Sequence, residues 1–144
     1  MRLSSILGAK GGTVHTIHPD ALVSGLVAVL AEVGVGALVV SEDGRTIAGI
    51  VSERDVVRAL ATDPGILEQP VSVIMTTDVT CAGPDDFVEE LAAAMTEQRV
   101  RHVPVLDDED HLVGIVSIGD VVKSRLDELN GEREALVGYI TQGG

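Results

Sequence analysis

The sequence predicts an α/β (α+β) fold in which one β-α-β-β-α unit occurs twice, with pseudo-two-fold symmetry between the copies. The main observation is that the stretch Gly49–Val57 returns, with changes, as Gly114–Val122, 65 residues later. The same offset aligns residues 14–57 with residues 79–122 without a gap. A repeat of that length corresponds to a structural unit, so the chain is a tandem duplication.

Composition and charge fit this fold and exclude several functions. Hydrophobic residues make up 45% of the 144 residues and aromatic residues only 1%, so Val, Leu, Ile and Ala must build the core. The net charge of −13 repels nucleic acids and anionic membranes, so we expect neither as a partner. A phosphorylated ligand would need a local cationic pocket. A single cysteine, Cys81, and the lack of a signal-peptide pattern suit the cytoplasm.

In the first copy, we expect an extended segment at 13–17, then a helix that starts after Pro19, and strands at 37–40 and 47–51. The apolar stretch 21–40 is long enough to span a bilayer. Its counterpart in the second copy carries many charged residues, so we interpret both stretches as a buried helix followed by a strand.

The second copy repeats this order, with an extended segment at 78–82 and strands at 102–106 and 112–116. Asp86 and Glu89 have the spacing of a capping box at the start of its first helix. We divide the chain into a first unit, a linker rich in proline and glycine, a second unit, and a C-terminal helix with a tail. Their ranges are 1–64, 65–70, 71–125 and 126–144.

The C-terminal region 121–140 is predicted to form one long helix. Its apolar residues follow a heptad-like spacing that is interrupted at Arg133. They are Val122, Leu126, Leu129, Leu136 and Ile140. Two interpretations are open at this point: the helix packs on its own domain, or it forms a dimer contact.

The best functional clue is the repeated Ser-x-x-Asp at a strand-to-helix turn, Ser52 with Asp55 and Ser117 with Asp120. The simple interpretation is a helix cap, because Ser is a favoured N-cap residue and an early Asp suits the positive end of a helix. The functional interpretation is a ribose and phosphate corner. A carboxylate at the end of a strand can accept both ribose hydroxyls, and the helix N-terminus suits a phosphate.

The cations near these turns support the functional interpretation. Candidate phosphate-binding residues are Arg54, Arg99, Arg101, His102 and Lys123. Surface ion pairing is the alternative for about half of them. Where the second copy has Arg99, Arg101 and His102, the first has glycine or alanine, so the two sites should not be equivalent.

Other chemistry finds little support. His15 and His18 lack a third ligand, so no metal site is expected. Cys81 and His102 have no evident catalytic helper, and no nucleotide-loop or hydrolase motif occurs. We therefore expect a protein that is not an enzyme.

The doubled unit ending in Gly-Ile-Val-Ser-x-x-Asp resembles the CBS domain, the regulatory module named after cystathionine β-synthase. The strand at 101–105 and the lead-in at 71–76 add to the resemblance, which covers nearly the whole chain. It is similar to small stand-alone bacterial proteins made of one CBS pair. The resemblance implies two clefts that bind an adenine nucleotide: AMP, ADP, ATP, NAD(H) or S-adenosylmethionine, with AMP, ATP or NADH favoured.

The resemblance also assigns roles to residues. Asp55 and Asp120 would bind ribose, with Ser52 and Ser117 beside them. The wall around the base would comprise Thr13, His15, Thr16, Gly36, Ala37, Val79, Thr80, Cys81, Val103 and Pro104. The implied protein is a homodimeric sensor or regulatory module that reports the nucleotide to an unknown protein partner. The alternative is a structural or interaction module with vestigial clefts.

Overall fold

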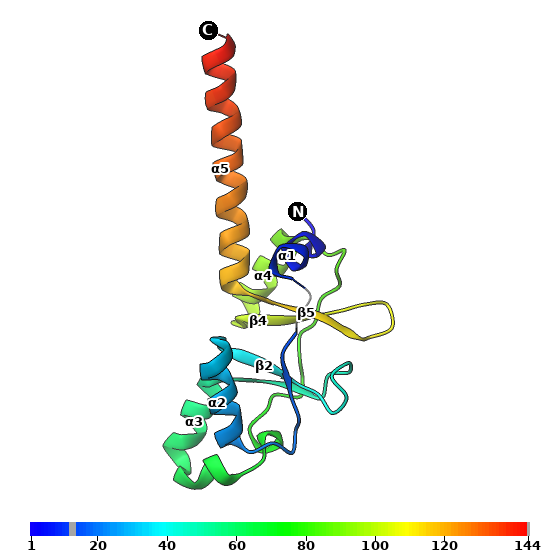
Figure 1. Cartoon of the computed structure of the whole chain (residues 1–144), viewed down its shortest axis with the longest axis vertical. Helices are drawn as coiled ribbons and strands as arrows, with labels where there is room; N and C mark the ends of the chain where they lie inside the picture. The colour runs from blue at the N-terminus through cyan, green and yellow to red at the C-terminus, as the bar shows by residue number, and fades with distance from the viewer. Residues whose placement is uncertain (12–13, 144) are drawn as a thin grey trace.

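The computed structural model describes residues 1–11 and 14–143, and the side chains up to residue 140. The first repeat is a three-stranded sheet with two helices (Figure 1). In this sheet β1 pairs in parallel with β2, and β2 pairs antiparallel with β3. The elements are β1 (Thr16–Ile17), α2 (Val23–Val33), β2 (Ala37–Val40), β3 (Gly49–Ser52) and α3 (Glu53–Thr62).

The second repeat follows the same order with one element reduced. Its hairpin is antiparallel, with a register irregularity between Val105 and Leu106. The strand expected at 78–82 is wrong as a full strand: in that segment only Ala82 bridges to β4, at Val105, in parallel. The elements are α4 (Val88–Gln98), β4 (His102–Leu106), β5 (Leu112–Ser117) and α5 (Ile118–Gly143).

An N-terminal helix, α1 (Leu3–Lys10), was not expected from the sequence. It lies beside α4 in the second repeat, although it belongs to the range 1–64 assigned to the first unit (Figure 1). Leu3 and Ile6 are buried in one cluster with Val88 and Leu91. The N-terminal segment therefore crosses to the other repeat and completes its core.

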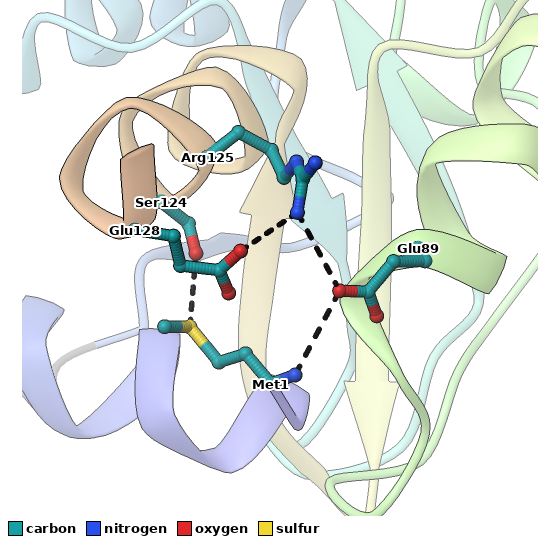
Figure 2. Close-up of polar contacts among 5 residues, drawn as sticks. All are labelled: Met1, Glu89, Ser124, Arg125 and Glu128. Carbon is teal, nitrogen blue, oxygen red and sulfur yellow. Dashed lines mark hydrogen bonds and ion pairs between the residues drawn. The ribbon is translucent and has the colours of Figure 1, made fainter. Parts of the chain in front are cut away.

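Polar contacts tie this N-terminus to α4 and α5 (Figure 2). The Met1 amino group lies 3.8 Å from Glu89, and the same carboxylate lies 3.9 Å from the guanidinium of Arg125. Arg125 also pairs with Glu128 at 2.7 Å, and the Ser124 hydroxyl donates to the Met1 sulfur. Glu89 thus bridges two chain segments instead of capping α4.

The expected capping box of Asp86 and Glu89 is wrong. Phe87 is the N-cap residue of α4 and makes no side-chain capping bond. The Asp86 carboxylate instead accepts a hydrogen bond from the Gly83 backbone N–H at 2.8 Å. The spacing of Asp86 and Glu89 did not predict that the Asp86 carboxylate would bind the backbone of the turn before the helix.

The segment between the repeats is folded onto the first core. It contains two 3-10 helices, η1 (Pro64–Glu68) and η2 (Val71–Val73), and buries Ile66 and Val71. The chain then pairs with β3, because Ile50 and Thr76 exchange two backbone hydrogen bonds of 2.9 Å. This pairing places the start of the second repeat against the end of the first sheet.

Most of α5 extends away from the body of the protein (Figure 1). Leu126, Leu129, Leu136 and Ile140 are each more than half exposed. The interpretation that this helix packs on its own domain therefore does not hold beyond its first turns. The stretch 21–40 is a helix followed by a strand, as expected, and among the described residues no helix is long and apolar enough to cross a membrane.

Candidate functional site

The first Ser-x-x-Asp turn forms a complete capping box at the start of α3. The Ser52 backbone N–H and hydroxyl both donate to Asp55 Oδ2, at 2.8 and 3.1 Å. The Asp55 backbone N–H donates back to the Ser52 hydroxyl at 3.3 Å. In the described part of the chain, Asp55 Oδ1 has no hydrogen-bond partner and stays available for a ligand.

This turn opens into a cleft of about 310 Å³, a size that suits a small ligand. The cleft lies between the repeats, because Ser52 and Asp55 of the first repeat share it with Arg99, Arg101 and His102 of the second. The cations that are present only in the second copy therefore line the same cleft as the Ser-x-x-Asp turn of the first copy. The asymmetry between the copies is an asymmetry between the two walls of one cleft.

The predicted site residues separate into two groups. Those that line the cleft are Ser52, Arg54, Asp55, Gly36, Ala37, Val79, Thr80, Arg99, Arg101 and His102. Those that do not line it are His15, Thr16, Cys81, Val103, Pro104, Ser117, Asp120 and Lys123. Val103 is buried in the second core, and Thr13 lies outside the described residues.

The cleft also contains residues that the sequence did not assign to a site. They are Ile50, Glu53, Arg58, Thr76, Asp78 and Val100. Arg58 follows Arg54 by one helical turn, so its position on the same face of α3 could have been inferred. The pairing of Thr76 with Ile50 places Thr76 and Asp78 in the cleft. No local sequence pattern predicts this pairing.

The four guanidinium groups of the cleft are unusual for such an acidic chain. The sequence has 23 carboxylate residues, yet Arg54, Arg58, Arg99 and Arg101 form no ion pair within the described residues. Three of them, Arg54, Arg99 and Arg101, also line an adjoining open hollow of about 350 Å³. Exposed and unpaired cations in a cleft can bind an anionic ligand.

Arg99 has a backbone conformation that L-residues rarely adopt. It ends α4 with φ of 56° and ψ of 38°, in the left-handed region. The equivalent residue in the first repeat, Gly34, ends α2 with φ of 76°. A non-glycine residue costs about 1 kcal/mol in this region, so Arg99 is present at some expense to stability.

His102 lines the cleft and lies near charged residues of both Ser-x-x-Asp turns, Glu53 and Asp120. Burial lowers the pKa of His102, and the Lys10 ammonium lowers it further, against opposing effects of Asp120 and Glu53. The imidazole is therefore neutral at neutral pH. Its ring lies close to Gly36, where an added Cβ would be 3.5 Å from both the His102 ring and the Glu53 carboxylate.

The second Ser-x-x-Asp turn has the same backbone contacts but an additional cation. The Ser117 backbone N–H donates to Asp120 Oδ2 at 2.8 Å, and the Asp120 N–H donates to the Ser117 hydroxyl at 3.1 Å. Lys10 of α1 donates to the same Oδ2 at 2.7 Å and to the Ile115 carbonyl at 2.8 Å. Burial alone would raise the pKa of Asp120, but the hydrogen bonds from Lys10 and Ser117 lower it overall.

The fold and the paired turns define a class of protein, and comparison with known families agrees. The model of the CBS domain matches residues 13–62 and 71–127, one match for each repeat. The chain therefore belongs to the CBS-domain family and contains a CBS pair. The resemblance inferred from the repeated motif is confirmed.

Individual relatives show the same pair in different settings. The chain is 34% identical to the mitochondrial CBS domain-containing protein CBSX3 of Arabidopsis thaliana, over 99% of this chain and 72% of that protein. It is 33% identical to inosine-5'-monophosphate dehydrogenase of Methanocaldococcus jannaschii, over 78% of this chain. This match spans only 22% of the dehydrogenase, so the resemblance does not extend to most of that enzyme.

Solved structures confirm the fold. The CBS-domain containing protein ATU1752 of Agrobacterium tumefaciens superposes with a TM-score of 0.83 and 38% identity, over 87% of this chain and 99% of that one. The CBS pair of protein MJ0100 gives a TM-score of 0.79 and 26% identity, over 89% and 98% of the two chains. That pair was solved in complex with 5'-methylthioadenosine and S-adenosyl-L-methionine.

Proposed function

We propose that this CBS pair binds an adenine nucleotide in the cleft at Ser52 and Asp55 and acts as a regulatory module. One observation carries the proposal. The cleft combines a half-buried carboxylate that has a free oxygen with four guanidinium groups that have no ion-pair partner among the described residues. A ribose needs the first feature and a phosphate needs the second.

The geometry suggests a role for each group. Ser52 holds Asp55 by Oδ2, so Oδ1 can accept hydrogen bonds from the ribose hydroxyls. Arg99 and Arg101 of the second repeat would hold the phosphates together with Arg54 of the first. Val79 and Ala37 offer apolar surface for the base. The adenosine-containing ligands of the MJ0100 pair support the adenine class, and AMP, ATP or NADH is the ligand proposed here.

Regulation would follow from the position of the cleft between the repeats. A ligand held by Asp55 on one wall and Arg101 on the other links two units that have separate cores. It changes a dimer or partner equilibrium only if it binds the two states with different affinity. We propose a homodimer that signals to a protein partner in the cytoplasm and has no catalytic activity. The capping boxes also fit the alternative of a structural module with vestigial clefts.

Calorimetry on the purified chain tests the proposal with AMP, ATP and NADH. Asp55→Ala should weaken binding well over tenfold, because it removes the ribose acceptor. Asp63→Ala is the matched control, since Asp63 also makes a capping bond, to the Gly65 N–H at 2.9 Å, but does not line the cleft. Each variant should lose about 1 kcal/mol of stability through its cap.

Two results would decide against the proposal. If folded wild-type protein binds none of the three nucleotides, the cleft is vestigial and the structural alternative stands. If Asp55→Ala and Asp63→Ala bind equally well, the nucleotide does not use the Ser52–Asp55 corner.

A further inference from the structure

The two Ser-x-x-Asp corners differ in what occupies their carboxylates. At the first Ser-x-x-Asp corner, Asp55 Oδ2 accepts a hydrogen bond from the Ser52 hydroxyl. At the second corner, Asp120 Oδ2 accepts a hydrogen bond from the Lys10 ammonium, which also donates to the Ile115 carbonyl. If the 65-residue offset is continued beyond the aligned residues, Lys10 corresponds to Met75, whose sulfur packs near Gly49 of the first repeat. This position is one of those at which the two corners differ.

The Lys10 ammonium lies against the carboxylate to which a ribose hydroxyl would donate at this corner, although it takes Oδ2 and leaves Oδ1 without a partner among the described residues. A hydroxyl donates to a carboxylate or carbonyl oxygen, and the ammonium already donates to one of each, at 2.7 and 2.8 Å. Lys10 also neutralises the Asp120 charge, which makes the remaining oxygen a weaker acceptor. A ligand at the second corner has to compete with Lys10 for Asp120.

The position of Lys10 in the fold favours this contact. Lys10 is in the last turn of α1, and α1 is anchored by Leu3 and Ile6 in the second core. The side chains of Lys10 and Asp120 are 37% and 21% exposed, so the pair is partly shielded from water. The following residue, Gly11, has φ of 88°, so the chain turns sharply directly after Lys10.

We propose that Lys10 is an internal competitor that weakens ribose binding at the second corner and restricts high-affinity nucleotide binding to the first. This inference rests on the proposed function, because it assumes that the corners bind ribose. It makes Lys10 the residue that determines which of two similar corners is used. Displacing Lys10 would also release the end of α1, so binding at the second corner would be coupled to the N-terminal helix.

The test isolates the second corner in the Asp55→Ala variant and then removes the competitor. Adenosine and AMP are titrated by calorimetry into Asp55→Ala, into Asp55→Ala with Lys10→Met, and into Asp55→Ala with Arg45→Met. Methionine is the residue found 65 positions after Lys10, at Met75, which packs beside Gly49 of the first repeat. Arg45 is an exposed arginine in the turn between β2 and β3, belongs to neither corner and has no ion pair among the described residues, so its removal controls for net charge.

Lys10→Met should tighten the binding of both ligands about tenfold, because one competing charge-assisted hydrogen bond is lost, while Arg45→Met should change little. Adenosine separates two explanations, because it has no phosphate. If Lys10→Met weakens AMP but not adenosine, Lys10 is a phosphate contact and the inference is wrong. Equal affinity with and without Lys10, or no binding in either protein, also overturns it.

Failure of this inference can be told apart from failure of the proposed function. If the wild-type protein binds AMP and loses it on Asp55→Ala, the proposed function holds whatever Lys10 does. If the wild-type protein binds no nucleotide, the proposed function fails. Thermal unfolding of each variant confirms that it is folded before the titrations are compared.

Discussion

At the scale of single residues, each position of one repeat can be compared with the equivalent position of the other. Arg99 and Gly34 end equivalent helices with the same left-handed backbone conformation, and glycine is the residue that adopts it without strain. The second repeat has arginine there, in the wall of the cleft. The Arg99 backbone N–H donates to the Met95 carbonyl, as any residue there could, but its side chain makes no hydrogen bond or ion pair in the described part of the chain.

Arg99→Gly should therefore separate stability from binding. We expect the free energy of unfolding to rise by up to about 1 kcal/mol, because the left-handed strain is removed. We expect the affinity for AMP to fall about tenfold, because one phosphate donor is lost. Urea unfolding and calorimetry on the same preparation measure both quantities. A variant that is less stable but binds normally would contradict the assignment of Arg99 to the ligand.

At the scale of elements, the repeated Gly-Ile-Val-Ser strand uses its glycine differently in each copy. A Cβ added at Gly49 would lie 2.7 Å from the Thr76 carbonyl oxygen, which belongs to the backbone that pairs with β3. A Cβ added at Gly114 would meet only the end of the Leu7 side chain. A side chain can rotate away, but the paired backbone cannot move without breaking its hydrogen bonds.

Gly49→Ala should cost about 1–3 kcal/mol of stability, within the usual range for overpacking, and Gly114→Ala should cost less. Gly49→Ala should also weaken nucleotide binding, because Thr76 and the residues after it form one wall of the cleft. Chemical denaturation of the two variants, followed by calorimetry, tests this. Equal costs at the two glycines would show that the pairing of Thr76 does not constrain β3.

Element prediction succeeded where the pattern was local and failed where the partner was distant. The strands at 37–40 and 102–106 were predicted with the observed bounds, because a short apolar run followed by a polar turn specifies a strand directly. Helix α1 was missed, since its two buried side chains, Leu3 and Ile6, owe their burial to contacts with α4. The strand expected at 78–82 has only one residue, Ala82, bridged to β4.

At the scale of the whole molecule, α5 is the feature that the single chain leaves unpartnered. Its apolar residues Leu126, Leu129, Leu136 and Ile140 follow a 3-7-4 spacing and are all more than half exposed. That spacing is the one by which two helices pack in a coiled coil, with Arg133 in the remaining seam position. This supports the proposed homodimer.

Replacing both Leu129 and Leu136 with Asp should convert a dimer to a single chain without loss of folding, because neither side chain belongs to a core. Light scattering after size exclusion gives the mass, and circular dichroism checks the fold. Ala135→Asp is the control, since Ala135 lies next to the seam but outside its heptad positions. A wild-type protein with the mass of one chain would refute dimerisation.

The sequence by itself determined the duplication, the order of elements and the two Ser-x-x-Asp turns, because all of these are recorded in spacing along the chain. Only the tertiary structure decided which residues face one another. It brought Arg99 and Arg101 of the second repeat to Asp55 of the first, and Lys10 to Asp120. The physical reason is that these pairs are joined by the packing of α1 and the pairing of Thr76 with β3, which are contacts between segments far apart in sequence.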